Sequence, residues 1–178
     1  MEKAKIFAAV RSGEDLENAI NSKAEVIFML SPNIKDIKSQ VESVHKAGKR
    51  IFIHLDLAEG IGKDEYGIIY AKEQGVDGII STRTNIIKLA KKLGIFTVQR
   101  FFLVDSHSVE TTIESVKSSK ADMIEIMPGT LSKVIKRLKK ELNMPIVAGG
   151  LIETWEEINE AISSGAAAIS VGKREFWE

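Results

Sequence analysis

Two glycine-containing segments in the last third of the sequence have the composition of a phosphate site. Gly149-Gly150 ends one short apolar run, and Ser170-Val171-Gly172-Lys173 ends the next. Glycine lets backbone N–H groups approach an anion closely. Each favourable helix-terminus contact contributes about 0.3–1 kcal/mol, so several must converge on one phosphate. We therefore expect phosphate contacts from Gly149, Gly150, Ser170, Gly172 and Lys173. The alternative is two ordinary turns that need positive φ angles.

Polar side chains within other apolar runs predict a second set of ligand contacts, His54, Asp56, Arg100 and Glu125. An unpaired buried carboxylate costs several kcal/mol, so Asp56 and Glu125 each need a cation, a hydroxyl donor or a metal. Arg100, Lys173 or His54 could supply the cation, and the hydroxyl groups of a small polyol could serve instead. A structural ion pair is the alternative for the carboxylates, and a packing role is the alternative for His54. Strand alternation lets only one of Gln99 and Arg100 face inward, and the sequence leaves this choice open.

The composition excludes several other chemistries. In 178 residues, 25 basic side chains balance 25 acidic ones, which rules out a chain-wide cationic surface. The sequence has no cysteine, and its three histidines are dispersed, so we expect neither a metal nor a cofactor. No nucleophile–base series is present, and we expect no catalytic residue. No apolar run approaches the ~20 residues that span a bilayer, and the start of the chain does not resemble a signal peptide. We expect a soluble, cytoplasmic protein without membrane contacts.

Short apolar runs rich in β-branched residues alternate with amphipathic segments along the whole chain. Glycines stand where these amphipathic helices should end, and Asn33 and Thr154 stand at plausible N-caps. Such alternation predicts parallel strands joined by crossover helices. The expected strands are Ile6–Val10, Val26–Leu30, Ile51–Leu57, Gly78–Thr82, Phe96–Leu103, Met123–Met127, Ile146–Gly150 and Ala167–Val171.

Two architectures fit this alternation, an open doubly wound sheet and a closed TIM-type barrel. Length favours the open sheet, because a barrel usually takes ~250 residues. The third strand favours the barrel, because Ile51, Ile53, Leu55 and Leu57 would face the helices while Phe52, His54 and Asp56 face the interior. We predict a single-domain, compact (β/α)8 barrel over residues 1–178, with a short or truncated last helix. Such a barrel could form a homo-oligomer that covers the side left exposed by the short last helix.

One amphipathic segment is strongly basic on its polar face. Lys133, Lys136, Arg137 and Lys140 lie outside the apolar stripe of this segment. A solvated helix face is the simplest interpretation of each residue. Their density also makes an RNA-facing patch a hypothesis, and without aromatic neighbours this patch would contact the RNA backbone.

An ordered set of motifs resembles the glycerol-3-phosphate responsive antiterminator family over nearly the whole chain. The motifs are His54-Leu55-Asp56-Leu57, Asp77-Gly78-Ile79-Ile80-Ser81-Thr82, Gln99-Arg100 with Asp105-Ser106, Glu125-Ile126-Met127-Pro128-Gly129, Pro145-Ile146-Val147-Ala148-Gly149-Gly150-Leu151-Ile152, and Phe176-Trp177.

The resemblance implies a bacterial regulator of glycerol uptake and utilisation genes. Its expected partners are glycerol 3-phosphate and the leader mRNA of glycerol operons. With the ligand bound, such a protein prevents premature transcription termination. A phosphosugar isomerase, epimerase or lyase that uses Asp56 and Glu125 as acid and base is the alternative function.

Overall fold

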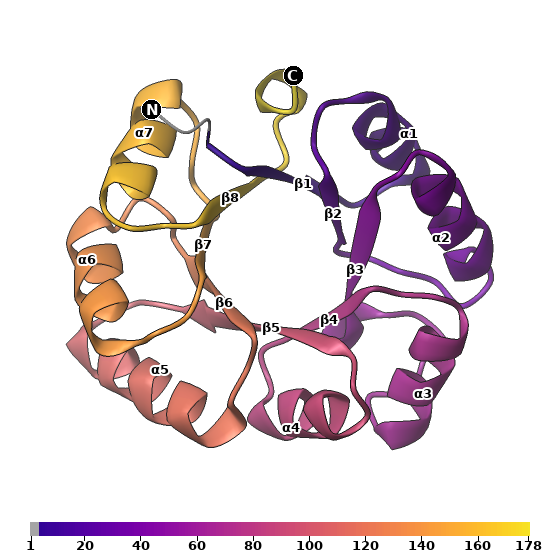
Figure 1. Ribbon diagram of the computed structural model, residues 1–178, viewed down its shortest axis with the longest axis horizontal. Helices are drawn as coiled ribbons and strands as arrows, with labels where there is room; N and C mark the ends of the chain where they lie inside the picture. The colour runs from indigo at the N-terminus through magenta and orange to yellow at the C-terminus, as the bar shows by residue number, and fades with distance from the viewer. Residues whose placement is uncertain (1–3) are drawn as a thin grey trace.

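The computed structural model describes residues 4–178, which form a closed barrel of eight parallel strands surrounded by helices (Figure 1). Neighbouring strands follow chain order around the ring, and β8 pairs with β1 to close it. The predicted barrel is therefore confirmed. The strands are β1 (Ile6–Val10), β2 (Val26–Met29), β3 (Arg50–His54), β4 (Gly78–Ser81), β5 (Phe96–Phe102), β6 (Met123–Met127), β7 (Ile146–Gly149) and β8 (Ala168–Val171).

Residues 4–178 contain seven α-helices, each of which crosses from one strand to the next. They are α1 (Gly13–Asn21), α2 (Ile37–Lys46), α3 (Glu65–Glu73), α4 (Thr84–Lys92), α5 (Ser106–Ser119), α6 (Ser132–Glu141) and α7 (Trp155–Ser163). None of the helices in this part of the chain is long and apolar enough to cross a membrane.

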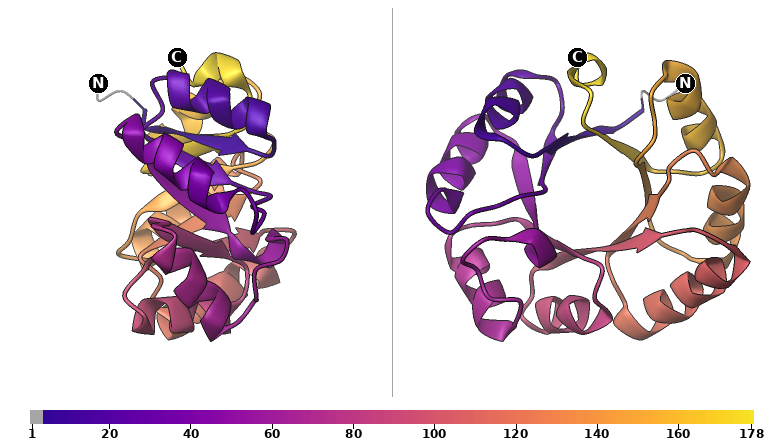
Figure 2. Two further views of the ribbon diagram at one scale, coloured as in Figure 1. Left: turned by 90° about the vertical axis from the view of Figure 1, so that its right-hand side faces the viewer. Right: turned by 180° about the vertical axis from the view of Figure 1, so that it is seen from behind.

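A single 3₁₀ turn, η2 (Arg174–Phe176), follows β8 where an eighth helix would complete the repeat. Figure 2 shows this turn between α7 and α1. The indole Nε1 of Trp177 donates to the carbonyl of Val171 at 2.9 Å, and the Phe176 ring packs edge-on against Trp155 at 5.0 Å between centroids. Two aromatic side chains thus cover the strand that lacks a helix, as the predicted truncation requires.

Local sequence signals position most helix ends. Thr154 and Glu157 form the predicted capping box at the start of α7. Asn33 was expected to be an N-cap, and this expectation is wrong. Helix α2 starts later, after Asp36, because Asn33 forms a β-bridge to Glu59 and its side chain accepts the N–H of Lys35.

The third strand is shorter than expected. It ends at His54, and Leu55–Leu57 form the 3₁₀ turn η1. Leu55 is fully buried, but Leu57 is 51% exposed and does not face the helices. Asp56 therefore lies after the strand rather than within it.

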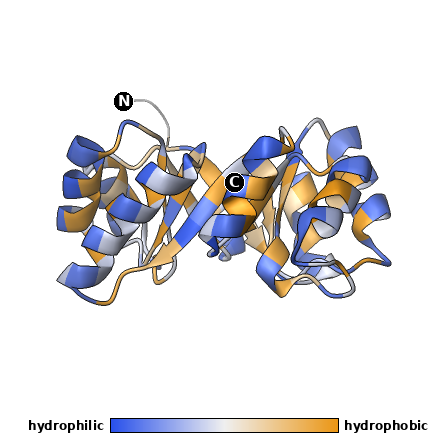
Figure 3. Cartoon of the chain, turned by 90° about the horizontal axis from the view of Figure 1, so that it is seen from below, coloured by the Kyte–Doolittle hydropathy of each residue, from blue (hydrophilic) through white to orange (hydrophobic). Residues whose placement is uncertain are grey.

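The apolar residues form two layers, one inside the barrel and one between the barrel and the helices. Figure 3 shows hydrophobic strands and hydrophobic helix faces turned toward them. Inside the barrel, Phe7, Phe28, Phe52 and Phe96 form an aromatic ladder with successive ring centroids 5.2, 5.7 and 5.4 Å apart. Gly78 leaves room for this ladder, because a Cβ there would lie 3.0 Å from the Phe52 ring.

Candidate functional site

A pocket of about 350 Å³ opens at the carboxyl ends of the strands, which we call the mouth of the barrel. Active and binding sites of this fold lie at that end, because the βα loops meet there. Its walls come from the ends of β1, β2, β5 and β6 and from the loops after β7 and β8. They include Arg11, Leu30, Arg100, Met127, Gly150 and Ser170.

The loops after β7 and β8 lie side by side, because Gly149 pairs with Ser170 in the sheet. Gly150 and Leu151 both have left-handed backbones, with φ angles of +74° and +56°. The N–H groups of Gly150, Leu151, Ile152 and Gly172, all of which line the pocket, donate to no acceptor in the described part of the chain. Successive unpaired backbone N–H groups of this kind form an anion-binding concavity.

Arg100 and Glu125 form a buried ion pair below these loops. Arg100 Nε donates to Glu125 Oε2 at 2.7 Å, and both residues are almost completely buried. Their strands are adjacent, and the two residues are register partners. Gln99 points the other way, with its Nε2 donating to Thr84 Oγ1 at 3.1 Å. Regular alternation in β5 therefore places Arg100, and not Gln99, inside the barrel.

Several buried polar atoms around this ion pair have no hydrogen-bond partner. They are Glu125 Oε1, Arg100 Nη2, Ser170 Oγ and both ring nitrogens of His54. We call the four residues His54, Arg100, Glu125 and Ser170 the polar layer. An unsatisfied buried polar group costs about 1–3 kcal/mol, so such a concentration needs an explanation. Groups of a bound ligand would satisfy these atoms.

Gly149 leaves space beside the buried Glu125 carboxylate, although neither residue lines the mouth pocket itself. A Cβ at this position would lie only 2.7 Å from Glu125 Oε1 and 3.4 Å from the Ser170 Cβ. Any side chain at this position would displace the carboxylate oxygen that lacks a partner. The glycine therefore provides space next to Glu125.

Asp56 accepts three hydrogen bonds from Ser81, the last residue of β4, and from Thr82, which follows it. Its Oδ1 accepts from Ser81 Oγ at 2.6 Å, and its Oδ2 accepts from the Thr82 N–H and Oγ1, both at 2.8 Å. Burial raises the pKa of Asp56, but these hydrogen bonds lower it more, so the net shift is downward. The ionised Asp56 carboxylate thus links the turn after β3 to the end of β4 through three hydrogen bonds. Its contact with a ligand stays a prediction.

His54 is neutral at pH 7. Burial lowers the pKa of His54 to about 4, and Arg100 adds repulsion that outweighs the attraction of Asp56, whose Oδ2 lies 3.8 Å from the ring Nε2. A neutral imidazole has one donor and one acceptor nitrogen. His54 can therefore donate one hydrogen bond to an uncharged ligand group and accept another from it.

Two basic residues differ from the sequence-based expectation. Lys173 does not line the pocket, because its ammonium donates to the Glu153 carbonyl at 3.1 Å and lies over the Phe176 ring. Arg11 does line the pocket and was missed. The signal that reveals it is alternation, since it lies two residues after Ala9, which packs inside the barrel.

The four basic residues of α6 lie on its outer face, away from the mouth pocket. Lys133, Lys136 and Lys140 are exposed. Arg137 already pairs with Glu110 and with Glu141, the latter at 2.8 Å. Its positive charge is therefore largely compensated by neighbouring carboxylates.

The fold and its pocket define a (β/α)8 barrel whose mouth suits a small anionic ligand. The chain belongs to the glycerol-3-phosphate responsive antiterminator family, whose sequence model matches residues 6–177. This is a family of regulators and not one of enzymes.

Similar proteins cover almost the whole chain. The glycerol uptake operon antiterminator regulatory protein from Listeria monocytogenes is 31% identical with a TM-score of 0.92, over 99% of this chain and 96% of that one. A glycerol uptake operon antiterminator-related protein from Thermotoga maritima is 32% identical with a TM-score of 0.88, over 98% of both chains. The uncharacterized protein YgcP from Escherichia coli is 37% identical over 97% of this chain and 91% of its own length.

Proposed function

We propose that the mouth pocket binds glycerol 3-phosphate and that the bound ligand controls the affinity of the protein for leader RNA of glycerol genes. The observation that supports this most strongly is the polar layer beneath a loop pair with unpaired backbone N–H groups. A ligand with a phosphate at one end and hydroxyl groups at the other matches both parts. Action on a nascent transcript implies a cytoplasmic location.

The phosphate group is assigned to the loops after β7 and β8. Gly149, Gly150, Ser170 and Gly172 are its proposed contacts, joined by Arg11 from the end of β1. Lys173 is excluded from direct contact, because its side chain is turned toward Glu153. Several N–H donors and a guanidinium together supply enough favourable contacts to hold a dianion.

The glycerol end is assigned to the polar layer. Glu125 Oε1 is an acceptor without a donor, and Arg100 Nη2 is a donor without an acceptor. A hydroxyl group can donate to the carboxylate, whereas a ketone oxygen in the same place would only repel it. The pocket should therefore prefer glycerol 3-phosphate to dihydroxyacetone phosphate. Sites that hydrogen-bond a substrate hydroxyl reject analogues that lack it.

A thermal-shift titration tests the ligand. At a hundred times its dissociation constant, glycerol 3-phosphate should stabilise the folded protein by about 2.7 kcal/mol. Glycerol, inorganic phosphate and dihydroxyacetone phosphate should each give a clearly smaller shift at the same concentration. Equal shifts for all four compounds would contradict the proposed pocket.

A pair of matched glycine variants sharpens this test. Gly149→Ala should reduce glycerol 3-phosphate affinity at least about tenfold, because the new Cβ would displace Glu125 Oε1. Gly13→Ala is the control, because a Cβ there meets nothing within 4 Å. A gel-shift titration of a glycerol-operon leader transcript, with and without the ligand, tests the regulatory part. RNA affinity that does not depend on the ligand would contradict it.

A further inference from the structure

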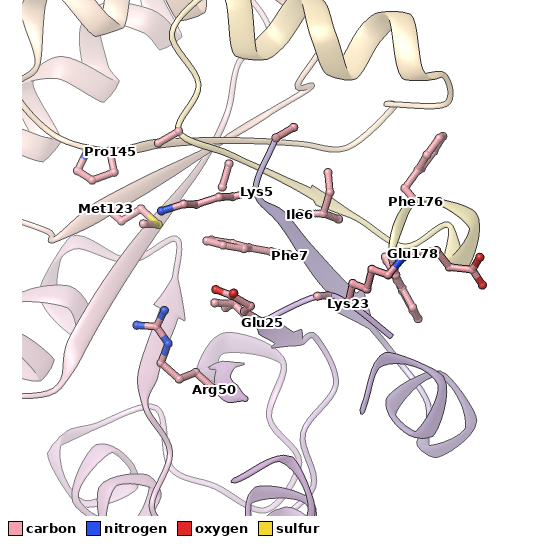
Figure 4. Close-up of a pocket in the computed structure, with 16 residues that line it drawn as sticks. Lys5, Ile6, Phe7, Lys23, Glu25, Arg50, Met123, Pro145, Phe176 and Glu178 are labelled. Atoms are coloured by element: carbon pink, nitrogen blue, oxygen red, sulfur yellow. The ribbon is translucent and has the colours of Figure 1, made fainter. Parts of the chain in front are cut away.

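A second pocket lies at the opposite end of the barrel, where the strands begin. Its volume is about 440 Å³, and the aromatic ring of Phe7 lies at its centre, with Met123 and Pro145 beside it (Figure 4). Basic side chains surround this apolar floor. We call this cavity the N-terminal pocket, and it shares no lining residue with the mouth pocket.

Three basic residues line the N-terminal pocket, namely Lys5, Lys23 and Arg50. Figure 4 shows Lys5, just before β1, and Arg50, at the start of β3, extending toward the same side of the pocket, with Phe7 between them. None of the three side chains forms a salt bridge or hydrogen bond with residues 4–178. Glu25 and Glu178 also line the cavity, so basic residues outnumber acidic ones there.

The helices add further positive charge at this end of the barrel. The last turns of α2, α4 and α6 carry Lys46, Lys92 and Lys139-Lys140, whereas Lys91 of α4 pairs with Asp122. Cations at helix C-termini offset the helix dipole, which explains these lysines without any ligand. That explanation does not extend to Lys5, Lys23 and Arg50, which lie outside the helices. These three exposed residues are available to contact an anion at the pocket.

The mouth has the opposite charge distribution. First-turn residues of α1, α3 and α7 include Glu14, Asp15, Glu65 and Glu156-Glu157. Acidic residues therefore gather in the first helical turns at the mouth, where Arg174 pairs with Glu14 and Asp15, and three basic residues line the N-terminal pocket. A long polyanion is attracted more strongly to the N-terminal end than to the acidic helix starts around the mouth.

We infer that single-stranded RNA binds across the N-terminal end of the barrel, with phosphodiester groups at Lys5, Lys23 and Arg50 and one nucleotide in the N-terminal pocket. This inference rests on the RNA-binding function proposed above. A volume of about 440 Å³ lies within the usual range for small-ligand pockets, and the apolar floor around the buried Phe7 ring can contact the face of a base. RNA at this end also stays clear of the ligand phosphate in the mouth, so both anions can be bound together.

The test is a fluorescence-anisotropy titration of a labelled glycerol-operon leader transcript with saturating glycerol 3-phosphate. Lys5→Gln/Arg50→Gln should weaken binding about tenfold or more in 0.1 M salt and lower the salt slope by about 1.4, or 0.7 per lost phosphate contact. Lys35→Gln/Lys38→Gln is the matched control. It removes the same charge from exposed positions at the start of α2, near the mouth, and should change affinity less than about twofold.

Stabilisation by glycerol 3-phosphate shows that each variant is folded. Should Lys5→Gln/Arg50→Gln not fold, Lys23→Gln alone is expected to lower the salt slope by about 0.7.

Unchanged RNA affinity in these variants would overturn the inference, as would an equal loss of RNA affinity in the control variant. If only Lys133→Gln/Lys136→Gln lowered the RNA affinity, the inference would be overturned and the RNA site would lie on α6. Tighter binding to anionic phospholipid vesicles than to RNA would overturn it in favour of a membrane surface. Wild-type protein without any RNA affinity would instead refute the proposed function itself.

Discussion

The two ends of the barrel interior share the same strand geometry but differ in the side chains that point inward. The aromatic ladder contains apolar rings in mutual contact, and it extends from Phe7 to Phe96. The polar layer lies nearer the mouth and contains five buried polar atoms without partners. In both regions, every second strand residue points inward. The comparison teaches that inward positions near the mouth hold unsatisfied polar groups at the expense of stability, while the packed rings deeper in the barrel contribute stability.

The largest expected effect comes from separating the buried ion pair. Arg100→Met leaves the Glu125 carboxylate buried without its cation and should lower the free energy of unfolding by about 3–5 kcal/mol. Arg100→Met/Glu125→Leu removes both charges and should recover most of that loss. Both variants should lose stabilisation by glycerol 3-phosphate. Urea denaturation measures the difference, and a double variant as unstable as the single one would contradict our view of the polar layer.

A second prediction concerns the stability of the protein at acidic pH. His54 has a folded-state pKa of about 4 against an ordinary value of 6.5, so between these values only the unfolded chain binds the proton. Stability should therefore fall as the pH drops from 6.5 toward 4, by about 3 kcal/mol from this residue. His54→Gln should remove this component. Unfolding free energies of both proteins at pH 7 and pH 4.5 provide the check, and an identical pH dependence would show that another group is responsible.

The smallest effect is expected in the aromatic ladder. Phe28→Leu should cost about 1–2 kcal/mol, because it removes two ring contacts but keeps most of the buried volume. Phe96→Leu is the matched control and should cost less, because Phe96 is 39% exposed and has a single ladder contact. Thermal denaturation compares the two variants. Glycerol 3-phosphate affinity should stay unchanged, and a tenfold loss in Phe28→Leu would show that the two ends are coupled.

Most of the fold could be predicted because its signals are local. Glycines at helix ends, the Thr154 capping box and strand alternation each depend on a few neighbouring residues. Alternation also predicts inward positions for His54 and Glu125. The same rule extended past the end of β1 would have identified Arg11.

The features that sequence reasoning missed depend on contacts between distant segments. The turn that ends β3 is held by hydrogen bonds from Ser81 and Thr82 to Asp56, 25 and 26 positions apart. The direction of Lys173 depends on the Glu153 carbonyl, 20 positions away. No local pattern in the sequence reports such pairings. For the same reason, an isolated strand pattern could not choose between Gln99 and Arg100.

The consecutive left-handed residues Gly150 and Leu151 imply a loop of fixed shape. Leucine adopts this conformation at a cost of roughly 1–2 kcal/mol, so the surrounding structure must hold it in place. The Gly129 N–H contributes by donating to the Gly150 carbonyl at 3.0 Å. A loop already fixed in shape loses little conformational entropy when its partner arrives. A metabolite of only a few heavy atoms can then be captured efficiently by a rigid receptor.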